Sequence, residues 1–242
     1  MKNMSDYISI IIPCFNEEKR ILETLKTLFA FCKGNFEKFE IIFVDDGSTD
    51  QTWGIVGSEF YDSPFFKTIR LNKNRGKGYA VREGMLKALG QYQFFTDADL
   101  PYGTECFLQA LNILKRSDCD IVTGARDLSE SRDMAQSDKG RKIASRFFSS
   151  IVNILLNIHI KDTQCGFKGF NANCAKELFG RSKINSFAFD VELFVLARKS
   201  GFVIEKMPVT LLKSKHSKVK LGHDPFLMLI DILKLWFLTN SP

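Results

Sequence analysis

Two aspartates one residue apart are the strongest chemical signal in this 242-residue chain. Asp97 and Asp99 follow an apolar segment, with only Ala98 between them. Mg²⁺ and Mn²⁺ favour carboxylate oxygens, and substrate phosphates often complete their coordination. A solvated turn would also account for two acids at this spacing. The apolar residues before them and Pro101 after them favour a strand end that holds a divalent cation and a bound diphosphate.

A second pair of acids follows another apolar segment, in Val44–Ser48. Asp45 and Asp46 precede a Gly-Ser turn, so their carboxylates could hydrogen-bond a ribose and the edge of a base. The alternative is an ordinary turn in which an aspartate caps the next helix. The pair is therefore a candidate nucleoside site.

A short basic loop, Asn74–Gly78, precedes a predicted helix. Backbone N–H groups at a helix start bind phosphate readily, and Arg75, Gly76 and Lys77 could take part. The loop lacks the G-x-x-x-x-G-K-[ST] spacing of a P-loop, which argues against a Walker-type nucleotidase.

The spacing of apolar residues predicts the elements that must position these groups. The predicted strands are Ile8–Ile12, Glu40–Val44, Lys67–Leu71, Tyr92–Thr96 and Asp120–Thr123. The predicted helices between them are Glu17–Lys33, Gln51–Phe60, Gly78–Leu89 and Thr104–Lys115, the first capped by Asn16. This alternation predicts an α/β fold, a mostly parallel sheet with helices on both faces. Ligands bind such sheets at the carboxyl ends of the strands, where all four aspartates fall.

The second half of the chain has a different pattern. It predicts a polar loop at Asp127–Asp138, a long amphipathic helix at Lys139–Ile158 and a glycine-containing segment at Asp162–Phe170. These are followed by a helix at Asp190–Lys199 that is closed by Gly201, a strand at Val203–Leu211 and a final apolar helix at Pro225–Leu238. No linker or repeat divides the chain. We expect one domain over 1–242, with two differently patterned halves at 1–124 and 125–242.

Composition limits the partners. The net charge of +6 suits phosphates or an anionic membrane face, and no basic-aromatic pattern indicates nucleic acid. The six cysteines form no C-x-x-C pair, which favours reduced thiols, and the three histidines have no metal-ligand spacing. No signal peptide and no spanning segment is evident. We therefore expect a protein that is cytosolic or peripheral to a membrane.

Taken together, four motifs resemble the family 2 glycosyltransferases, which have the GT-A (Rossmann-like) fold. The motifs are Ile11–Glu18, Val44–Asp50, Asn74–Gly78 and Asp97–Asp99. A second set resembles the dolichyl-phosphate glucosyltransferases and their bacterial polyprenyl-phosphate relatives, namely Gly124–Arg126, Asp162–Lys168 and Phe187–Leu193. The resemblance covers almost the whole chain. It implies a nucleotide-sugar-binding half at 1–124 and an acceptor-binding and membrane-contact half at 125–242.

The resemblance implies a role for each matching position. The expected nucleoside pocket is lined by Pro13, Asn16, Glu17 and Asp46. Further substrate-binding candidates are Phe15, Asp45, Arg75, Gly76 and Lys77. Asp97, Ala98 and Asp99 would hold the donor, with Asp97 and Asp99 on Mg²⁺ or Mn²⁺. The expected phosphate and acceptor residues are Arg126, Asp162, Lys168, Asp190, Ser217 and Lys218, and of these Arg126, Asp162 and Asp190, together with Asp99, are the catalytic candidates. His216 stands where such enzymes often have glycine.

The implied reaction is one displacement, with inversion, that moves a sugar from a nucleotide sugar to a polyprenyl phosphate. UDP-glucose is the favoured donor; UDP-N-acetylglucosamine, UDP-galactose and GDP-mannose stay open. A lipid phosphate is already anionic and needs a cationic clamp, for which Arg126, Lys168 and Lys218 are candidates. A saccharide hydroxyl acceptor, the first alternative, would need Asp162 or Asp190 as base. A nucleotide-binding module without catalysis is the second.

Two helices raise the question of membrane contact. Lys139–Ile158 combines a basic beginning with a wide apolar face, and Pro225–Leu238 is rich in Phe, Leu and Ile. Such a face packs either on the sheet or on anionic lipid. Because the chain has two such helices, and the lipid-linked enzymes that it resembles act at membranes, we expect attachment to an anionic membrane surface. The expected location is cytoplasmic, peripheral on the inner face of a membrane.

Overall fold

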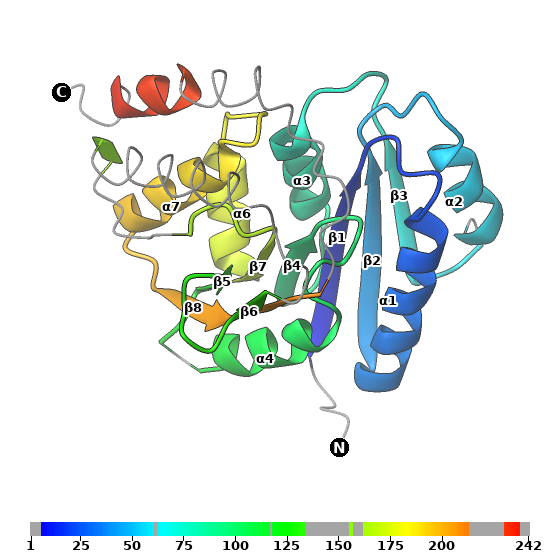
Figure 1. The fold of residues 1–242 in the computed structure, drawn as a ribbon, viewed down its shortest axis with the longest axis horizontal. Coiled ribbons are helices and arrows are strands. Elements are labelled where there is room, and N and C mark those ends of the chain that lie inside the picture. The colour runs from blue at the N-terminus through cyan, green and yellow to red at the C-terminus, as the bar shows by residue number, and fades with distance from the viewer. Residues whose placement is uncertain are drawn as a thin grey trace.

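The computed structural model describes residues 6–60, 62–116, 118–133, 155–156, 162–212 and 230–237. A seven-stranded sheet runs through the middle of the molecule in the order β3-β2-β1-β4-β7-β5-β8 (Figure 1). Its strands are β1 (Tyr7–Cys14), β2 (Lys38–Asp45), β3 (Phe66–Arg70), β4 (Tyr92–Thr96), β5 (Ile121–Ala125), β7 (Phe167–Asn171) and β8 (Ile204–Pro208). All neighbouring strands are parallel except β7, which is antiparallel to both β4 and β5.

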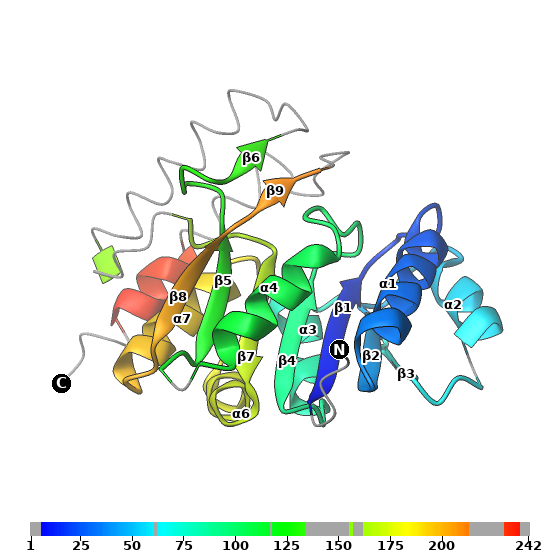
Figure 2. The same cartoon turned by 90° about the horizontal axis from the view of Figure 1, so that it is seen from below.

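Helices cover both faces of this sheet, as Figure 2 shows from below. They are α1 (Ile21–Asn35), α2 (Thr52–Phe60), α3 (Lys77–Leu86), α4 (Glu105–Leu114), α6 (Ala172–Arg181) and α7 (Phe189–Lys199). On one face α1, α2 and α4 pack on residues such as Ile10 and Phe43. On the other, α3, α6 and α7 pack on residues such as Ile11 and Phe95. Successive strand residues thus enter opposite cores, as the period of two requires.

The predicted architecture is confirmed, and several of its elements need correction. The segment expected to be merely glycine-containing holds β7, and α6 was not predicted. The predicted strand Val203–Leu211 is divided into β8 and β9 (Thr210–Leu211), and β9 pairs with β6 (Arg132–Asp133) in a small second sheet. Pro208 lies at the division, and proline cannot donate to a sheet hydrogen bond.

The first helix begins later than predicted. α1 starts at Ile21 rather than Glu17, and Arg20 occupies the N-cap position without a side-chain cap. The prediction that Asn16 caps this helix is wrong, because its φ of 53° is left-handed and its Oδ1 accepts from the Thr49 N–H at 2.8 Å. Asn16 joins two loops instead.

The last described segment, 230–237, is helical and packs on α7. Ile232 and Leu235 are buried against Val191 and Phe194. This part of the predicted apolar helix therefore has an inward, packed face. The predicted amphipathic helix Lys139–Ile158 lies outside the described residues except for 155–156. Within the described part of the chain, every helix is too short or too polar to cross a lipid bilayer.

Candidate active site

Two loops that leave the carboxyl ends of β1 and β2 are joined by hydrogen bonds. The Asn16 N–H donates to Ser48 Oγ at 2.9 Å, and the Glu17 N–H donates to Thr52 Oγ1 at 2.7 Å. Asn16 Oδ1 accepts from Thr49, as described above. The polar motif residues of both loops thus stabilise each other's backbone, which fixes one wall of the candidate site.

The paired acids at the end of β2 are both buried and both engaged. Asp45 Oδ1 accepts from the Ser48 N–H at 3.0 Å, and its Oδ2 lies 3.5 Å from Arg70 Nε. Asp46 accepts from the N–H groups of Arg75 at 2.7 Å and Gly76 at 2.9 Å. Burial raises the pKa of Asp46 above its ordinary value, although these two N–H donors lower it. Asp46 therefore holds the basic glycine loop in place from the neighbouring strand.

That glycine loop is packed against a segment from the second half of the chain. Gly76 has a φ of 99°, and a Cβ at this position would overlap the Asn185 carbonyl oxygen. The Gly78 N–H donates to that same carbonyl at 2.8 Å. The Arg75 guanidinium lies 3.7 Å from the centre of the Tyr79 ring, a cation–π contact at the surface. Both glycines are needed because backbone meets backbone here.

The diacid after β4 faces two cations. Lys77 Nζ forms an ion pair with Asp97 Oδ1, and Arg20, which also pairs with Glu17, lies 3.7 Å from Asp99 Oδ2. The side chains of Asp97 and Asp99 stay 37% and 28% exposed, so a ligand can reach both. Burial raises the pKa of Asp99, and the nearby charge of Asp97 raises it further.

The diacid has the donor set that a hard divalent cation requires. Two partly exposed carboxylates at one strand end offer oxygen ligands, and the repulsion between them is relieved by added positive charge. Across the described ranges no three His, Cys, Asp or Glu side chains gather as a complete metal site. Asp97 and Asp99 could therefore hold Mg²⁺ or Mn²⁺ only with further ligands, such as water or a diphosphate.

Lys168 and Asp190 form a buried ion pair behind the diacid. Lys168 Nζ lies 2.5 Å from Asp190 Oδ1, and it also donates to the carbonyls of Thr163 at 3.3 Å and Cys165 at 2.9 Å. The Lys168 side chain has no exposed surface. The structure thus places it inside the protein rather than at a phosphate-binding surface, and gives it the carbonyls of the 163–165 loop as partners.

Asp162 and Arg126 form a second ion pair at the carboxyl end of β5. Asp162 accepts from the Arg126 backbone N–H and Nε, both at 2.8 Å, and from Nη2 at 2.7 Å. Burial alone would raise the pKa of Asp162, but these charged hydrogen bonds outweigh it and hold the pKa below its ordinary value. The Arg126 side chain keeps 40% of its surface exposed, so the guanidinium can also meet an anion.

The remaining candidate residues are apolar or lie outside the described residues. Pro13 is buried within β1 beside Val44, and Phe15 is half-buried. Ala98 is buried, and its carbonyl accepts from Thr24 Oγ1 at 2.8 Å, which ties the diacid loop to α1. Ser217 and Lys218 lie outside the described residues.

Two residues at the diacid were missed by the sequence reasoning. Arg20 reaches Asp99 from the start of α1, and Gly166 lies so close to Asp97 that a Cβ would overlap Oδ2. A lone arginine and a lone glycine carry no spacing signal. Gly166 belongs to the motif Asp162–Lys168, but only the antiparallel pairing of β7 with β4 brings it to the diacid.

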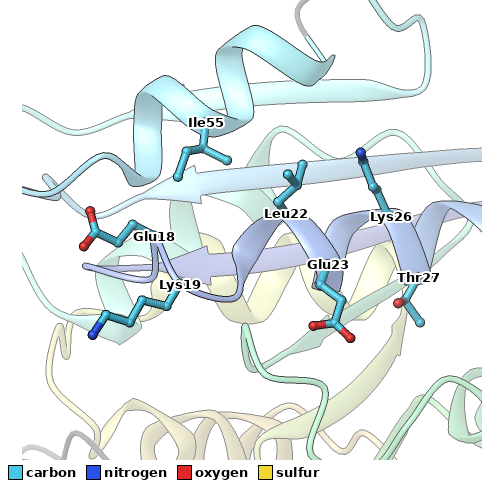
Figure 3. A pocket seen from close by; sticks show the side chains of 7 residues that line it. All are labelled: Glu18, Lys19, Leu22, Glu23, Lys26, Thr27 and Ile55. Atoms are coloured by element: carbon cyan, nitrogen blue, oxygen red, sulfur yellow. The ribbon is translucent and has the colours of Figure 1, made fainter.

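An open groove on the outside of the molecule is separate from these residues. It lies between α1 and α2, has a volume of about 490 Å³ and is drawn in Figure 3. Its walls are formed by Glu18, Lys19, Leu22, Glu23, Lys26, Thr27 and Ile55. Leu22 and Ile55 form its apolar part, and Lys26 pairs with Glu59 at 2.7 Å. It includes none of the candidate site residues.

This arrangement defines a nucleotide-binding class of α/β protein, with a glycine loop and acids at the carboxyl edge of the sheet. Comparison with known proteins identifies the family within it. Residues 9–179 match the sequence profile of glycosyl transferase family 2. The chain belongs to this family of glycosyltransferases.

Several relatives match over most of the chain. A dolichyl-phosphate beta-glucosyltransferase of Dictyostelium discoideum is 34% identical, covering 94% of this chain and 72% of the relative. One from Saccharomyces cerevisiae is 32% identical over 94% of this chain and 73% of the relative. The human protein of this name is 32% identical over 88% and 69%.

Solved structures confirm the GT-A fold. Glucosyl-3-phosphoglycerate synthase from Mycobacterium tuberculosis, in complex with Mn²⁺, UDP and glucosyl-3-phosphoglycerate, has a TM-score of 0.72 at 16% identity, covering 95% of this chain and 80% of that one. Mannosyl-3-phosphoglycerate synthase from Rubrobacter xylanophilus also has a TM-score of 0.72, at 14% identity over 98% and 75%.

Proposed function

We propose that this glycosyltransferase transfers glucose from UDP-glucose to a polyprenyl phosphate of the dolichyl type, with inversion at the anomeric carbon. The observation that carries the proposal is the similarity to dolichyl-phosphate beta-glucosyltransferases along 94% of the chain. A match of that extent spans both the donor edge around Asp97 and the second half of the chain, which contains the ion pair of Asp162 and Arg126.

On the donor side, Asp97 and Asp99 would hold Mg²⁺ or Mn²⁺. Their exposure, their closeness and their oxygen ligands suit such a cation, and similar folds were solved with Mn²⁺ or Mg²⁺ and UDP. A bound divalent cation supplies Lewis-acid stabilisation of the negative charge on a departing diphosphate. The chain itself supplies the loops tied by Asn16 and Asp46, which would orient the nucleoside.

On the acceptor side, the ion pairs that engage Asp162 and Asp190 support a phosphate acceptor rather than a hydroxyl acceptor. A hydroxyl acceptor needs a base with an available lone pair. Asp162 is engaged by Arg126 with a lowered pKa, and Asp190 is buried on Lys168. Neither is arranged as a general base. A lipid phosphate needs none, and the half-exposed Arg126 guanidinium could bind it through charge-assisted hydrogen bonds.

A panel of radiolabelled nucleotide sugars tests donor and acceptor together. With polyprenyl phosphate and Mn²⁺ present, we expect label from UDP-glucose to enter the organic phase faster than label from UDP-N-acetylglucosamine, UDP-galactose or GDP-mannose. Asp99→Asn should reduce this transfer at least 100-fold, on the order of the cost of losing one electrostatic stabiliser. Asp118→Asn, at an exposed surface position, should not.

The outcomes separate the candidate functions. Label recovered only in water-soluble saccharide would indicate a hydroxyl acceptor. No transfer and no donor hydrolysis with any nucleotide sugar would indicate a binding module without catalysis. NMR of the glycolipid should show a β-linked glucose from the α-linked donor, and an α linkage would refute the single displacement.

The lipid acceptor also requires a place at a membrane, for which we propose peripheral attachment on the cytoplasmic side. The helix at 230–237 turns Leu233 and Phe237 outward, 40% and 62% exposed, while its other face packs on α7. Exposed apolar side chains on a docked helix suit shallow insertion into lipid, and the net charge of +6 suits anionic headgroups. Flotation with anionic vesicles at low salt should carry the protein upward. Protein left at the bottom of the gradient would contradict this attachment.

A further inference from the structure

Lys77 occupies a position where a lysine is electrostatically unfavourable by itself. It is the first residue of α3, and no acidic residue follows in the first turn. The amino end of a helix carries a partial positive charge, which repels an ammonium group. The side chain is also only 17% exposed, so water stabilises it little. Its charge must therefore be balanced by carboxylates from other elements.

Two carboxylates provide this balance. Asp97 forms the ion pair with Lys77 through Oδ1, and Asp190 attracts the same ammonium group from the first turn of α7. Asp190 is itself held by Lys168 through Oδ1. Lys77 is thus paired with a partly exposed carboxylate at the donor site and attracted by a second, buried carboxylate.

The Asp97 carboxylate has little freedom to turn away. Gly166 of the loop before β7 lies against Oδ2 so closely that a Cβ there would overlap it. Asp97 is thereby held from one side by backbone and contacted on the other by Lys77. The lysine, with four rotatable bonds, is the partner that can move.

We propose that Lys77 competes with the divalent cation for Asp97, and that cation binding transfers the Lys77 ammonium from Asp97 to Asp190. Lys77 is then a positioning residue that keeps Asp97 oriented until the cation arrives. The inference rests on the proposed metal site at Asp97 and Asp99. It adds a prediction about this chain alone, that removing a positive charge at Lys77 tightens cation binding.

The test is Mn²⁺ binding to the full, nucleotide-free chain, measured from the electron paramagnetic resonance signal of free Mn²⁺. We expect Lys77→Met to bind Mn²⁺ about tenfold more tightly than the wild type, because its competitor is gone. Lys77→Gln should act in the same direction and serves if the methionine variant folds poorly. Lys77→Arg, which keeps the charge, should stay within about twofold of the wild type.

Two further variants make the result specific. Lys87→Met removes the same charge from the exposed carboxyl end of α3 and should leave the affinity unchanged. Asp99→Asn should weaken Mn²⁺ binding strongly. If Asp99→Asn has no effect, the proposed metal site itself fails. If Asp99→Asn weakens binding but neither Lys77→Met nor Lys77→Gln tightens it, the competition is refuted and the proposed function stands.

The transfer to Asp190 has a direct readout. A crystal structure of the wild-type chain with Mn²⁺ should show Lys77 Nζ within hydrogen-bond distance of an Asp190 oxygen and no longer paired with Asp97. Lys77 Nζ still on Asp97 beside bound Mn²⁺ would overturn the transfer.

Discussion

Asp46, Asp162 and Asp190 are the same side chain chemically, and their neighbours give them different properties. Asp46 accepts two backbone N–H groups and caps a loop. Asp162 is bound by a half-exposed arginine, and Asp190 by a fully buried lysine. Burial penalises the charge in each case, and the partner decides how much of that penalty remains.

The ion pair of Asp162 and Arg126 should make the free energy of unfolding depend on pH. Because Asp162 has a pKa below its ordinary value when folded, its stabilising contribution is complete above the ordinary pKa of about 3.9 and is lost as the pH falls through the folded pKa. Asp162→Asn should therefore lower the free energy of unfolding by roughly 1–3 kcal/mol near pH 6 and by less as the pH falls below 4. Urea denaturation from pH 3 to 6 measures both. The exposed Glu37→Gln should shift stability by under about 0.5 kcal/mol.

The stability of the protein should depend on whether the buried charges of Lys168 and Asp190 are paired. Lys168→Met leaves Asp190 without its closest cation, and we expect a loss of about 3–5 kcal/mol in the free energy of unfolding. The double variant Lys168→Met with Asp190→Leu removes both charges and should recover a large part of that loss in chemical denaturation. If the double variant loses more free energy of unfolding than the two single variants lose together, the pair does not act as a unit.

At the scale of elements, the contact of α3 with the segment before α7 joins the two halves of the chain. Gly78 at the start of α3 would place a Cβ 2.6 Å from the Ile184 carbonyl oxygen and 2.7 Å from Phe189 Cβ. Both distances are shorter than van der Waals contact. Backbone or side chains would have to move to admit even one methyl group, and the glycine loop would move with them.

Paired glycine substitutions test this contact. Gly78→Ala should lower the free energy of unfolding by about 1–3 kcal/mol through overpacking. Gly57→Ala in α2 meets nothing within 4 Å and should instead stabilise the protein by about 0.5–1 kcal/mol, because alanine favours helix. Chemical denaturation of the two variants should therefore give shifts of opposite sign, and equal shifts would contradict the close approach.

At the scale of the whole molecule, the helix at 230–237 connects the packed core to an apolar outer surface. Besides the burial of Ile232 and Leu235, Ser186 Oγ donates to Asp231 Oδ2 at 2.7 Å. Ser186 also accepts from the Ala188 N–H at 3.1 Å, directly before α7. The helix is thus held to the same segment that packs on the glycine loop.

Two truncations in that helix should have separate effects. Ile232→Ala removes a fully buried side chain and should lower the free energy of undocking by roughly 2–4 kcal/mol, visible as faster hydrogen exchange of the 230–237 amides. Leu233→Ala, at an outward position, should change exchange little but weaken vesicle flotation. Equal exchange rates in both variants would contradict the packed face.

Local periodicity and chain order were enough to predict the alternation of strands and helices and the parallel sheet. They also placed Asp45, Asp46, Asp97 and Asp99 at the carboxyl ends of strands. Which charged side chains pair with each other depends instead on the folded arrangement. The antiparallel insertion of β7 between β4 and β5 brings Gly166 against Asp97 and places Lys168 beside Asp190 of α7. Such pairings join residues far apart in the chain, and no local pattern encodes them, since they depend on strand order and burial.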